Sequence, residues 1–301
     1  MDLFYDSLCE LVEDTRRDEP MSRHVTFRTG GPADYFAAPA SVRELRAVVT
    51  LCREAEKPYF ILGNGSNLLV SDKGYRGVVI QVGRALGRVQ TAGSFLFAGA
   101  GATLASIAAR ALEAGLTGLE FAAGIPGTVG GAMVMNAGAY DGEMSQVVES
   151  VDVLTKFGEE KKLGNKELKL GYRTSCILPM EYIVTGAAFS LRPGDPAGIR
   201  AKMDELAARR KEKQPLEFPS AGSTFKRPAG NFAGKLIMEA GLKGFSVGGA
   251  CVSEKHCGFV VNKGGASSAD IMELCRIVKE RVREHSGVAL ELEIRLLGDF
   301  S

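Results

Sequence analysis

The chain has 301 residues, of which 45% are hydrophobic and 24% are charged, so it can bury a core in two or three packed units and is not a disordered protein. The 37 Lys and Arg residues nearly balance the 36 Asp and Glu residues. A formal net charge of +1 argues against a general nucleic-acid or anionic-membrane surface, although a local anion site is compatible with it.

The six cysteines are scattered and form no CxxC pair. This pattern indicates reduced thiols in a cytoplasmic protein rather than a disulfide framework. Cys251, His256 and Cys257 form one cluster without a second pair of ligands, so no metal site is expected.

The first twenty residues lack the basic start and apolar centre of a secretory signal. They predict an amphipathic helix whose inward side chains are Leu3, Phe4, Leu8, Leu11 and Val12. Further along the chain, Ser41 and Glu44 have the spacing of a capping box. They predict the start of a second helix, which Pro58 ends.

The next segments alternate between strand and helix patterns. Residues 59–63 and 77–82 are short apolar runs that suit buried strands. Residues 95–102 predict a strand that a turn joins to a helix over 103–115, with Gly115 just past the helix end. This alternation predicts α/β layering.

The second half of the chain continues the alternation. Residues 147–155 and 182–192 predict strands, and 196–215 predict a helix whose basic last turn is a solvated face that complements the helix dipole. From Pro215 a Gly/Ser-rich stretch begins a further unit. Its predicted elements are a strand at 258–262, a long helix at 267–287 and a closing strand at 288–298.

Residues 121–140, FAAGIPGTVGGAMVMNAGAY, form a run of twenty without a charged side chain. The length suits a membrane helix, but Pro126 and five glycines oppose a regular helix, and aromatic or basic anchors do not flank both ends. Inert buried packing and a backbone cradle for a flat or charged ligand remain as alternatives, and composition does not decide between them.

Two other loops begin like a dinucleotide-binding fingerprint. Residues 63–68 and 99–104 both start with GxG and both place leucine where the third glycine belongs, which argues against a Rossmann fold. The 99–104 copy indicates an ordinary strand–helix turn. The Asn and Ser residues of the 63–69 copy favour successive backbone N–H groups that converge on an anion, with a plain tight turn as the alternative.

Seven segments, in this order, resemble the UDP-N-acetylenolpyruvoylglucosamine reductase family and cover nearly the whole chain. They are HVTFRTGGPADYF (24–36), ILGNGSNLLVSD (61–72), FAAGIPGTVGGAMVMNAGAY (121–140), GYRTS (171–175), PSAGSTFKRP (219–228), AGKLIMEAGLKGFSVGGACVSEKH (233–256) and LELEIRLLG (290–298). The chain is similar to the shorter, type II-like subfamily, which lacks a substrate-covering tyrosine loop and part of the third domain.

The resemblance implies an α+β fold built from α/β layers. It implies a two-subdomain FAD-binding module of the vanillyl-alcohol oxidase (PCMH) type and a third α+β domain that binds the substrate. The first FAD-binding subdomain would comprise residues 1–88 joined by the C-terminal strand 288–301. The second would comprise residues 89–200, and the substrate-binding domain residues 201–287.

The resemblance also implies a flavoprotein oxidoreductase, a UDP-N-acetylmuramate dehydrogenase. NADPH would reduce FAD, and the reduced flavin would convert UDP-N-acetyl-3-O-(1-carboxyvinyl)-glucosamine to UDP-N-acetylmuramate. This reaction serves peptidoglycan synthesis and thus cell-wall biogenesis, cell shape and cell division in the cell cycle. The expected protein is a cytoplasmic monomer that binds a sugar nucleotide and neither nucleic acid nor membrane. The three histidines lie outside both cradle loops, so FAD is expected to be bound non-covalently.

By the family's pattern, three side chains are catalytic. Hydride addition leaves a carbanion, delocalised as an enolate onto the substrate carboxylate, which is so strong a base that a well-placed serine hydroxyl, Ser223, can protonate it. Arg173 and Glu293 take the roles at the carboxylate and the enolate: arginine can bind a carboxylate bidentately, and glutamate can assist only while it carries or shares a proton. Spacing alone would equally allow surface or turn positions for all three.

The same resemblance implies that loop 63–69 holds the pyrophosphate of FAD and that 124–132 and 136–138 line the pyrophosphate and the isoalloxazine ring. The implied cofactor contacts are Gly63, Asn64, Gly65, Ser66, Asn67, Leu68, Gly124, Ile125, Pro126, Gly127, Thr128, Gly130, Gly131, Ala132, Asn136, Ala137 and Gly138. Tyr172, Lys226 and Arg227 are expected to contact the anionic substrate.

Two other functions compete with this interpretation. One is an FAD-linked oxidase of similar fold with another substrate, against which AGSTF, YRTS and LEIR together argue. The other is a nucleotide-binding module that carries out no chemistry. A protein that stays colourless after incubation with FAD would exclude both flavoenzyme hypotheses.

Overall fold

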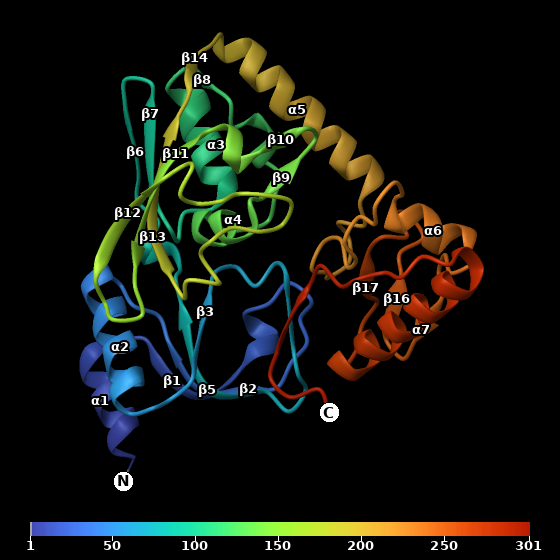
Figure 1. Cartoon of the computed structure of the whole chain (residues 1–301), viewed down its shortest axis with the longest axis horizontal. Helices are drawn as coiled ribbons and strands as arrows, with labels where there is room; N and C mark the ends of the chain where they lie inside the picture. The colour runs from blue at the N-terminus through green and yellow to red at the C-terminus, as the bar shows by residue number, and fades with distance from the viewer. Residues whose placement is uncertain (1) are drawn as a thin grey trace. The chain divides into compact units, whose positions relative to one another are not determined.

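The computed structural model describes residues 2–301, and this part of the chain divides by compactness into two units (Figure 1). The first unit comprises residues 2–17, 35–64 and 77–210, and the second comprises residues 18–34, 65–76 and 211–301. Three boundaries between the units fall inside strands, namely Thr15–Pro20, Pro32–Ala37 and Tyr75–Gln81.

The helices, in chain order, are α1 (Leu3–Leu11), α2 (Val42–Glu54), α3 (Leu104–Glu113), α4 (Val129–Met135), α5 (Pro196–Lys213), α6 (Ala233–Glu239) and α7 (Ser268–Ser286). The strands are β1 (Thr15–Pro20), β2 (Pro32–Ala37), β3 (Tyr59–Leu62), β4 (Leu68–Val70), β5 (Tyr75–Gln81), β6 (Val89–Ala92), β7 (Phe95–Gly99), β8 (Leu116–Thr117), β9 (Gly138–Ala139), β10 (Gly142–Glu143), β11 (Val148–Leu154), β12 (Glu160–Gly164), β13 (Ile183–Ser190), β14 (Arg192–Pro193), β15 (Ser246–Val247), β16 (Ala250–Val252), β17 (Val260–Asn262) and β18 (Arg295–Leu297).

A five-stranded antiparallel sheet, in the order β12-β11-β13-β7-β6, is the framework of the first unit (Figure 1). Helix α4 contacts β13 and β7, and α3 contacts β6 and β7, so apolar side chains of these elements share one buried core. The predicted strands at 95–102, 147–155 and 182–192 and the predicted helix at 103–115 are confirmed with slightly shifted ends.

A second sheet of four strands has the order β1-β2-β5-β3, in which β3 and β5 run parallel. The two short apolar runs at 59–63 and 77–82 are thus confirmed as strands. Ser41 is the N-cap of helix α2, and its Oγ accepts the Glu44 N–H at 3.2 Å, which confirms the predicted start. Helix α1 also forms, but Leu3 is 72% exposed. The inward prediction for Leu3 is wrong because Phe4, Leu8 and Leu11 follow the i, i+4, i+7 spacing of one face, and Leu3 lies about 100° away.

In the second unit, α7 packs against α6, β15 and β16. Its buried residues include Ile271, Leu274, Val278 and Val282, which recur at helical spacing. The predicted strand at 258–262 is confirmed as β17, and the long helix is confirmed as α7. The closing strand is shorter than predicted: only Arg295–Leu297 form a ladder, parallel to β4, because residues 288–294 have no continuous strand beside them.

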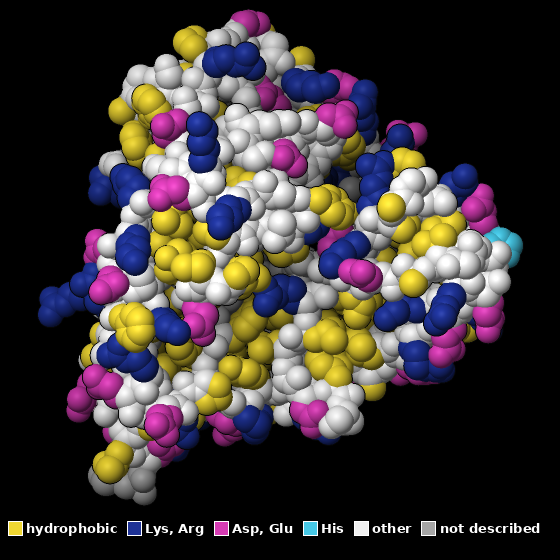
Figure 2. Space-filling view, in the orientation of Figure 1, with side chains coloured by type: hydrophobic (Ala, Val, Ile, Leu, Met, Phe, Trp, Pro, Cys, Tyr) yellow, Lys and Arg dark blue, Asp and Glu magenta, His cyan; other side chains and the backbone are white. Residues whose placement is uncertain are grey.

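The charge-free run at 121–140 is neither a membrane span nor wholly irregular. Residues 129–135 form α4, with Gly130 and Gly131 in its first turn, so the expectation that the glycines oppose a regular helix is wrong for this part. No helix within residues 2–301 is both long and apolar enough to cross a membrane. Figure 2 shows basic and acidic side chains interspersed over the face it draws, consistent with the nearly balanced net charge.

A capping box at the N-terminus of α7 is expected to stabilise this helix, and a substitution can test it. Ser267 Oγ accepts the Asp270 N–H at 3.0 Å, and the Asp270 carboxylate accepts the Ser267 N–H at 3.0 Å, which lowers the pKa of Asp270. We expect Ser267→Ala to lower the free energy of unfolding by about 1 kcal/mol. Urea unfolding followed by circular dichroism measures this. The control Glu284→Ala, on the exposed side of the same helix, should change it by less than about 0.5 kcal/mol; equal midpoints for both variants would refute the cap.

Candidate active site

The loop Gly63–Asn67 connects β3 to β4 in a shape that only glycine permits at its centre. Gly65 has φ +61°, and a Cβ there would collide with the carbonyl oxygen of His24 and lie 2.7 Å from Val25 Cα. The Thr26 N–H donates to the Gly65 carbonyl at 3.2 Å. The segment that begins at His24 therefore supports the middle of this loop.

Backbone donors of this loop have no partner within the described part of the chain. The N–H groups of residues 63–67 donate no hydrogen bond to any residue in the range 2–301. Backbone N–H groups in folded proteins are nearly always paired, so five successive donors without an acceptor are typical of a loop that binds an anion.

The start of α4 lies against the start of this loop within the first unit. A Cβ on Gly63 would lie 2.5 Å from Thr128 Oγ1, so the two chain segments are in contact only because position 63 has no side chain. Thr128 is the N-cap of α4, and its Oγ1 accepts the Gly131 N–H at 3.4 Å. The structure thus brings together two of the predicted cofactor segments.

The GxG pair at 99–104 has a different role, as predicted. A Cβ on Gly101 would collide with the Gly83 carbonyl oxygen, and the N–H groups of Val129 and Gly130 donate to Ala102 and Ala100 at 2.8 Å. These glycines permit close backbone packing beneath the start of α4. This loop is the ordinary strand–helix turn that the sequence indicated.

Asn136 ends α4 in the left-handed conformation, with φ +43° and 1% exposure. Its Nδ2 donates to the Gly171 carbonyl at 3.2 Å, and its Oδ1 accepts the Ser145 N–H at 2.9 Å. Asn136 therefore ties the charge-free run to the GYRTS turn, a link between segments 35 residues apart.

The GYRTS turn of the first unit carries Arg173. Gly171 and Thr174 exchange two backbone hydrogen bonds, of 3.1 and 3.2 Å, and Arg173 has φ +55°. Ser175 Oγ donates to the Val134 carbonyl on α4 at 2.9 Å, which anchors the turn. The Arg173 guanidinium lies 5.3 Å from the centre of the half-exposed Tyr172 ring.

Ser223 and Glu293 lie on neighbouring segments of the second unit. Phe225 and Leu292 form an antiparallel bridge, and the Glu293 N–H donates to the Thr224 carbonyl at 2.8 Å. Buried Thr224 also accepts the Val260 N–H at 2.9 Å through its hydroxyl. Both Ser223 and Glu293 are half-buried, and the backbone around them is held from two sides.

The glycine-rich loop also reaches this pair. Asn67 Nδ2 donates to the Glu293 carbonyl at 3.2 Å, and the Asn67 carbonyl accepts the Arg295 N–H at 3.0 Å. Asn67 and Glu293, which are 226 positions apart in the sequence, are therefore in contact in the second unit. The side chains of Ser223 and Glu293 remain half-exposed there.

Two protein-family models and several curated proteins match this chain. A family model described as the C-terminal domain of UDP-N-acetylenolpyruvoylglucosamine reductase matches residues 214–297, and an FAD-binding domain model matches residues 33–164. The reductase of Agathobacter rectalis is 52% identical over 296 residues, which cover 94% of each chain. The reductase of Clostridium perfringens is 50% identical over 297 residues, covering 98% of this chain and 97% of that protein.

This chain belongs to the UDP-N-acetylenolpyruvoylglucosamine reductase family. The crystal structure of the family member from Thermus caldophilus superposes with a TM-score of 0.82 at 38% identity, covering 94% of this chain and all of that one. The mixed α/β architecture, with an FAD-binding domain and the family's C-terminal domain, is thereby confirmed.

The residues of this family member fit an FAD pyrophosphate at loop 63–67. The unpartnered N–H groups supply donors for a doubly charged group, and the glycines keep side chains away from it. No acidic side chain lies in 63–67 or 124–132 to repel the ligand.

The predicted substrate-contact cations lie on the exposed segment after Ser223. Lys226 forms an ion pair with Glu291 at 2.9 Å, which lowers the pKa of Glu291. The Arg227 guanidinium stacks 3.9 Å from the centre of the Phe232 ring. Lys226 therefore has an internal acid as its neighbour, and Arg227 an aromatic ring.

Sequence reasoning missed one residue that packs on the glycine-rich run. The basic end of α5 was expected to be a solvated face, but Arg210 is partly buried, and burial lowers its pKa while a hydrogen bond to Tyr140 opposes that shift. A Cβ on Gly124 would lie 2.9 Å from Arg210 Nε. The guanidinium fits here because Gly124 has no side chain. The charge pattern of α5 alone could not predict this contact, since it depends on a residue in a distant segment.

Proposed function

We propose that the chain catalyses the NADPH-dependent, FAD-mediated reduction of UDP-N-acetyl-3-O-(1-carboxyvinyl)-glucosamine to UDP-N-acetylmuramate, the reaction EC 1.3.1.98 of peptidoglycan precursor synthesis. The observation that carries this proposal is the pairing of the segment after Ser223 with the segment before β18. It places the positions of Ser223 and Glu293 on two backbone segments that pair through Phe225 and Leu292, and Asn67 of the predicted flavin loop bonds to the Glu293 carbonyl.

The FAD site is proposed to comprise loop 63–68, residues 124–132 and residues 136–138. The N–H groups of 63–67 would hold the pyrophosphate, and the glycine-rich start of α4 would lie along the cofactor. Bound flavin, once reduced by NADPH, supplies the hydride for the substrate.

Side chains of the protein would bind the substrate carboxylate, stabilise the enolate charge and supply the proton. Arg173 would bind the substrate carboxylate through its fork of N–H donors. Ser223 would transfer its hydroxyl proton to the carbon that becomes carbanionic. Glu293, carrying or sharing a proton, would donate a hydrogen bond where negative charge develops on the enolate, and Tyr172, Lys226 and Arg227 would contact the anionic sugar nucleotide.

The domain assignment is part of the same proposal. Residues 1–88 with 288–301, and residues 89–200, would form the two FAD-binding subdomains, and residues 201–287 would bind the substrate. The pairing of β18 with β4 supports joining the C-terminal strand to the first subdomain. We propose that the active protein is a monomer, which the elution volume of flavin-loaded protein in size-exclusion chromatography tests.

The contact between Gly63 and Thr128 gives a prediction for cofactor affinity. We expect Gly63→Ala to weaken FAD binding by about tenfold, because the new methyl group would push the loop away from Thr128. Quenching of flavin fluorescence during titration of FAD-free protein measures the change. Gly198→Ala is the matched control, since its methyl group meets only Asp195 at 3.5 Å; an equal effect of both substitutions would contradict the cradle.

Stopped-flow flavin spectroscopy tests the function as a whole. Under anaerobic conditions we expect NADPH to bleach the flavin absorbance and the enolpyruvyl sugar nucleotide to restore it. Flavin that is reoxidised by oxygen but not by the sugar nucleotide would support an oxidase of similar fold instead. Protein that binds no flavin would refute both.

A further inference from the structure

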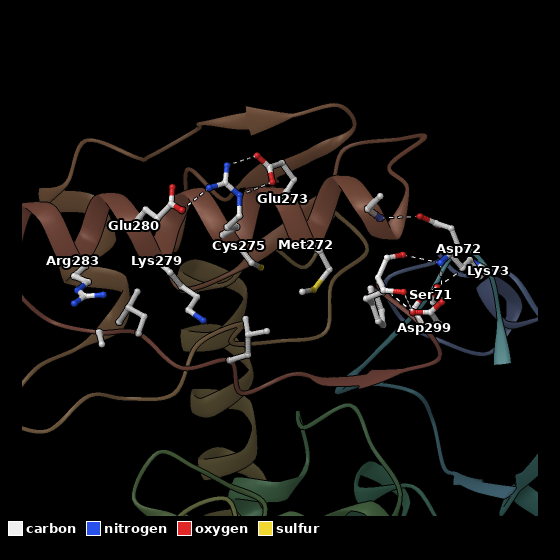
Figure 3. A pocket seen from close by; sticks show the side chains of 17 residues that line it. Ser71, Asp72, Lys73, Met272, Glu273, Cys275, Lys279, Glu280, Arg283 and Asp299 are labelled. Atoms are coloured by element: carbon white, nitrogen blue, oxygen red, sulfur yellow. Dashed lines mark hydrogen bonds and ion pairs between the residues drawn. The ribbon is translucent and has the colours of Figure 1, made fainter. Parts of the chain in front are cut away.

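A cavity of 840 Å³ lies within the second unit, between α7 and the C-terminal segment 289–301 (Figure 3). Helix α7 lines it with Met272, Cys275, Lys279 and Arg283, which are spaced three or four residues apart and so share one face of the helix. Figure 3 shows these side chains pointing toward the C-terminal segment, whereas Glu273 and Glu280 lie along the opposite edge of α7. The volume is within the range of pockets that bind small molecules.

The walls of this cavity are largely apolar. Leu290 is buried, and Met272, Leu292 and Phe300 are half-buried along it. Burial raises the pKa of Cys275 to about 12, so its thiol stays protonated and contributes only apolar surface. The cavity therefore offers contact area to an apolar group.

The acidic side chains around the cavity already have partners. Asp72 accepts the N–H groups of Ser268 and Ala269 at 2.8 Å each. The remaining acidic side chains pair with cations of the same cavity: Glu273 and Glu280 with Arg276, and Asp299 with Lys73.

Unlike Arg276 and Lys73, the cavity residues Lys279 and Arg283 have no acidic partner among the described residues. Neither forms an ion pair or a side-chain hydrogen bond with any residue between 2 and 301, and they lie one helical turn apart. Lys279 contributes to the lowered pKa of Glu291, but the ion pair of Glu291 is with Lys226. The cavity thus combines apolar walls with two positive charges that form no ion pair with any acid among residues 2–301, which favours an anion that has an apolar body.

We propose that this cavity binds a single-chain amphipathic anion, with one apolar chain and a carboxylate or phosphate head group. The chain would lie against Met272, Leu290 and Leu292, and the head group would bind Lys279 and Arg283. Glu293 does not line the cavity although Leu292 does, because successive side chains of an extended segment point to opposite sides. The proposal is therefore independent of the reductase chemistry.

Isothermal titration of flavin-loaded protein with decanoate, below its micelle concentration, tests the proposal. We expect saturable binding of one decanoate per chain. Octanoate, two methylene groups shorter, should bind about tenfold more weakly. Decyltrimethylammonium, with the same chain and the opposite charge, should not bind detectably.

Two variants examine the two halves of the site. The double variant Lys279→Gln/Arg283→Gln should weaken decanoate binding by about tenfold or more, and Ala289→Phe should weaken it by filling the cavity from its exposed edge. Arg281→Gln is the matched control: it removes a charge from α7, but its guanidinium stacks on Phe245 and does not line the cavity. Unchanged flavin content and melting temperature show that each variant is folded.

Three outcomes would overturn the proposal. Equal affinity for decanoate and decyltrimethylammonium would show that Lys279 and Arg283 do not select a negatively charged head group. Unchanged decanoate binding in both test variants would place the ligand elsewhere on the protein. Sedimentation of the protein with vesicles of phosphatidylglycerol, without binding of monomeric decanoate, would show recognition of a lipid surface rather than of a single chain.

Discussion

Ser223→Ala is expected to leave the reduction of bound flavin by NADPH nearly unchanged and to slow reoxidation by the enolpyruvyl sugar nucleotide by about 10²- to 10⁴-fold. Hydride transfer from NADPH to flavin needs no proton from the protein at the substrate carbon. The second half-reaction does need one, and without the hydroxyl the carbanion has no positioned donor. Because Thr224 holds the backbone through three hydrogen bonds, the substitution removes the hydroxyl without releasing the segment.

Stopped-flow measurement of each half-reaction separates these effects. Ser220→Ala is the matched control, since it removes a hydroxyl three residues away and keeps the Ser220 carbonyl that accepts the Thr26 hydroxyl at 2.6 Å. We expect both of its half-reactions to stay within about twofold of the parent rates. If Ser223→Ala slowed flavin reduction and reoxidation equally, a general loss of structure or of flavin geometry would explain the result, and the proton-donor role would be wrong.

Glu293→Gln is expected to produce the same asymmetry, with an effect of about 10²- to 10³-fold on reoxidation. The amide is nearly isosteric, but it is a weaker hydrogen-bond donor than a carboxylic acid and cannot share an acidic proton with the developing enolate. The backbone of Glu293 is fixed by Thr224 and Asn67, so the side chain is replaced within an unchanged framework.

The chain contains a closely matched control for this substitution. Glu291→Gln is the same chemical change two residues earlier in the same segment, at an exposed side chain that pairs with Lys226. It should leave both half-reactions within about twofold, because an exposed ion pair contributes little. Reoxidation that proceeds at the parent rate in Glu293→Gln would exclude this residue from the reaction.

The local elements were largely predictable, because their signals lie within a few neighbouring residues. Ser41 with Glu44, and Ser267 with Gly287, mark the helix ends that the structure has. Predictions went wrong where the outcome depends on distant partners. The closing strand was predicted too long because strand formation needs a neighbour, and only residues 295–297 lie beside one continuous strand, β4.

The site was predictable in part and for two different reasons. The prediction that Gly63–Asn67 binds an anion came from its glycines and its small polar residues. The roles of Arg173, Ser223 and Glu293 came from resemblance to a family, since nothing in their spacing separates them from ordinary surface residues. The cavity beside Lys279 and Arg283 had no sequence signal, because the C-terminal segment that completes it contacts α7 only in the folded chain.

By itself the sequence determined the helices, most strands, the absence of charge at 121–140 and the glycines that a cradle needs. These depend on local periodicity, backbone freedom and composition, which are properties of short segments. Only the tertiary structure decided that Gly63 lies against Thr128, that Asn67 holds the Glu293 backbone, and that Arg210 packs on Gly124. Such contacts join residues 60 to more than 200 positions apart, and chain folding, rather than any local preference, brings them together.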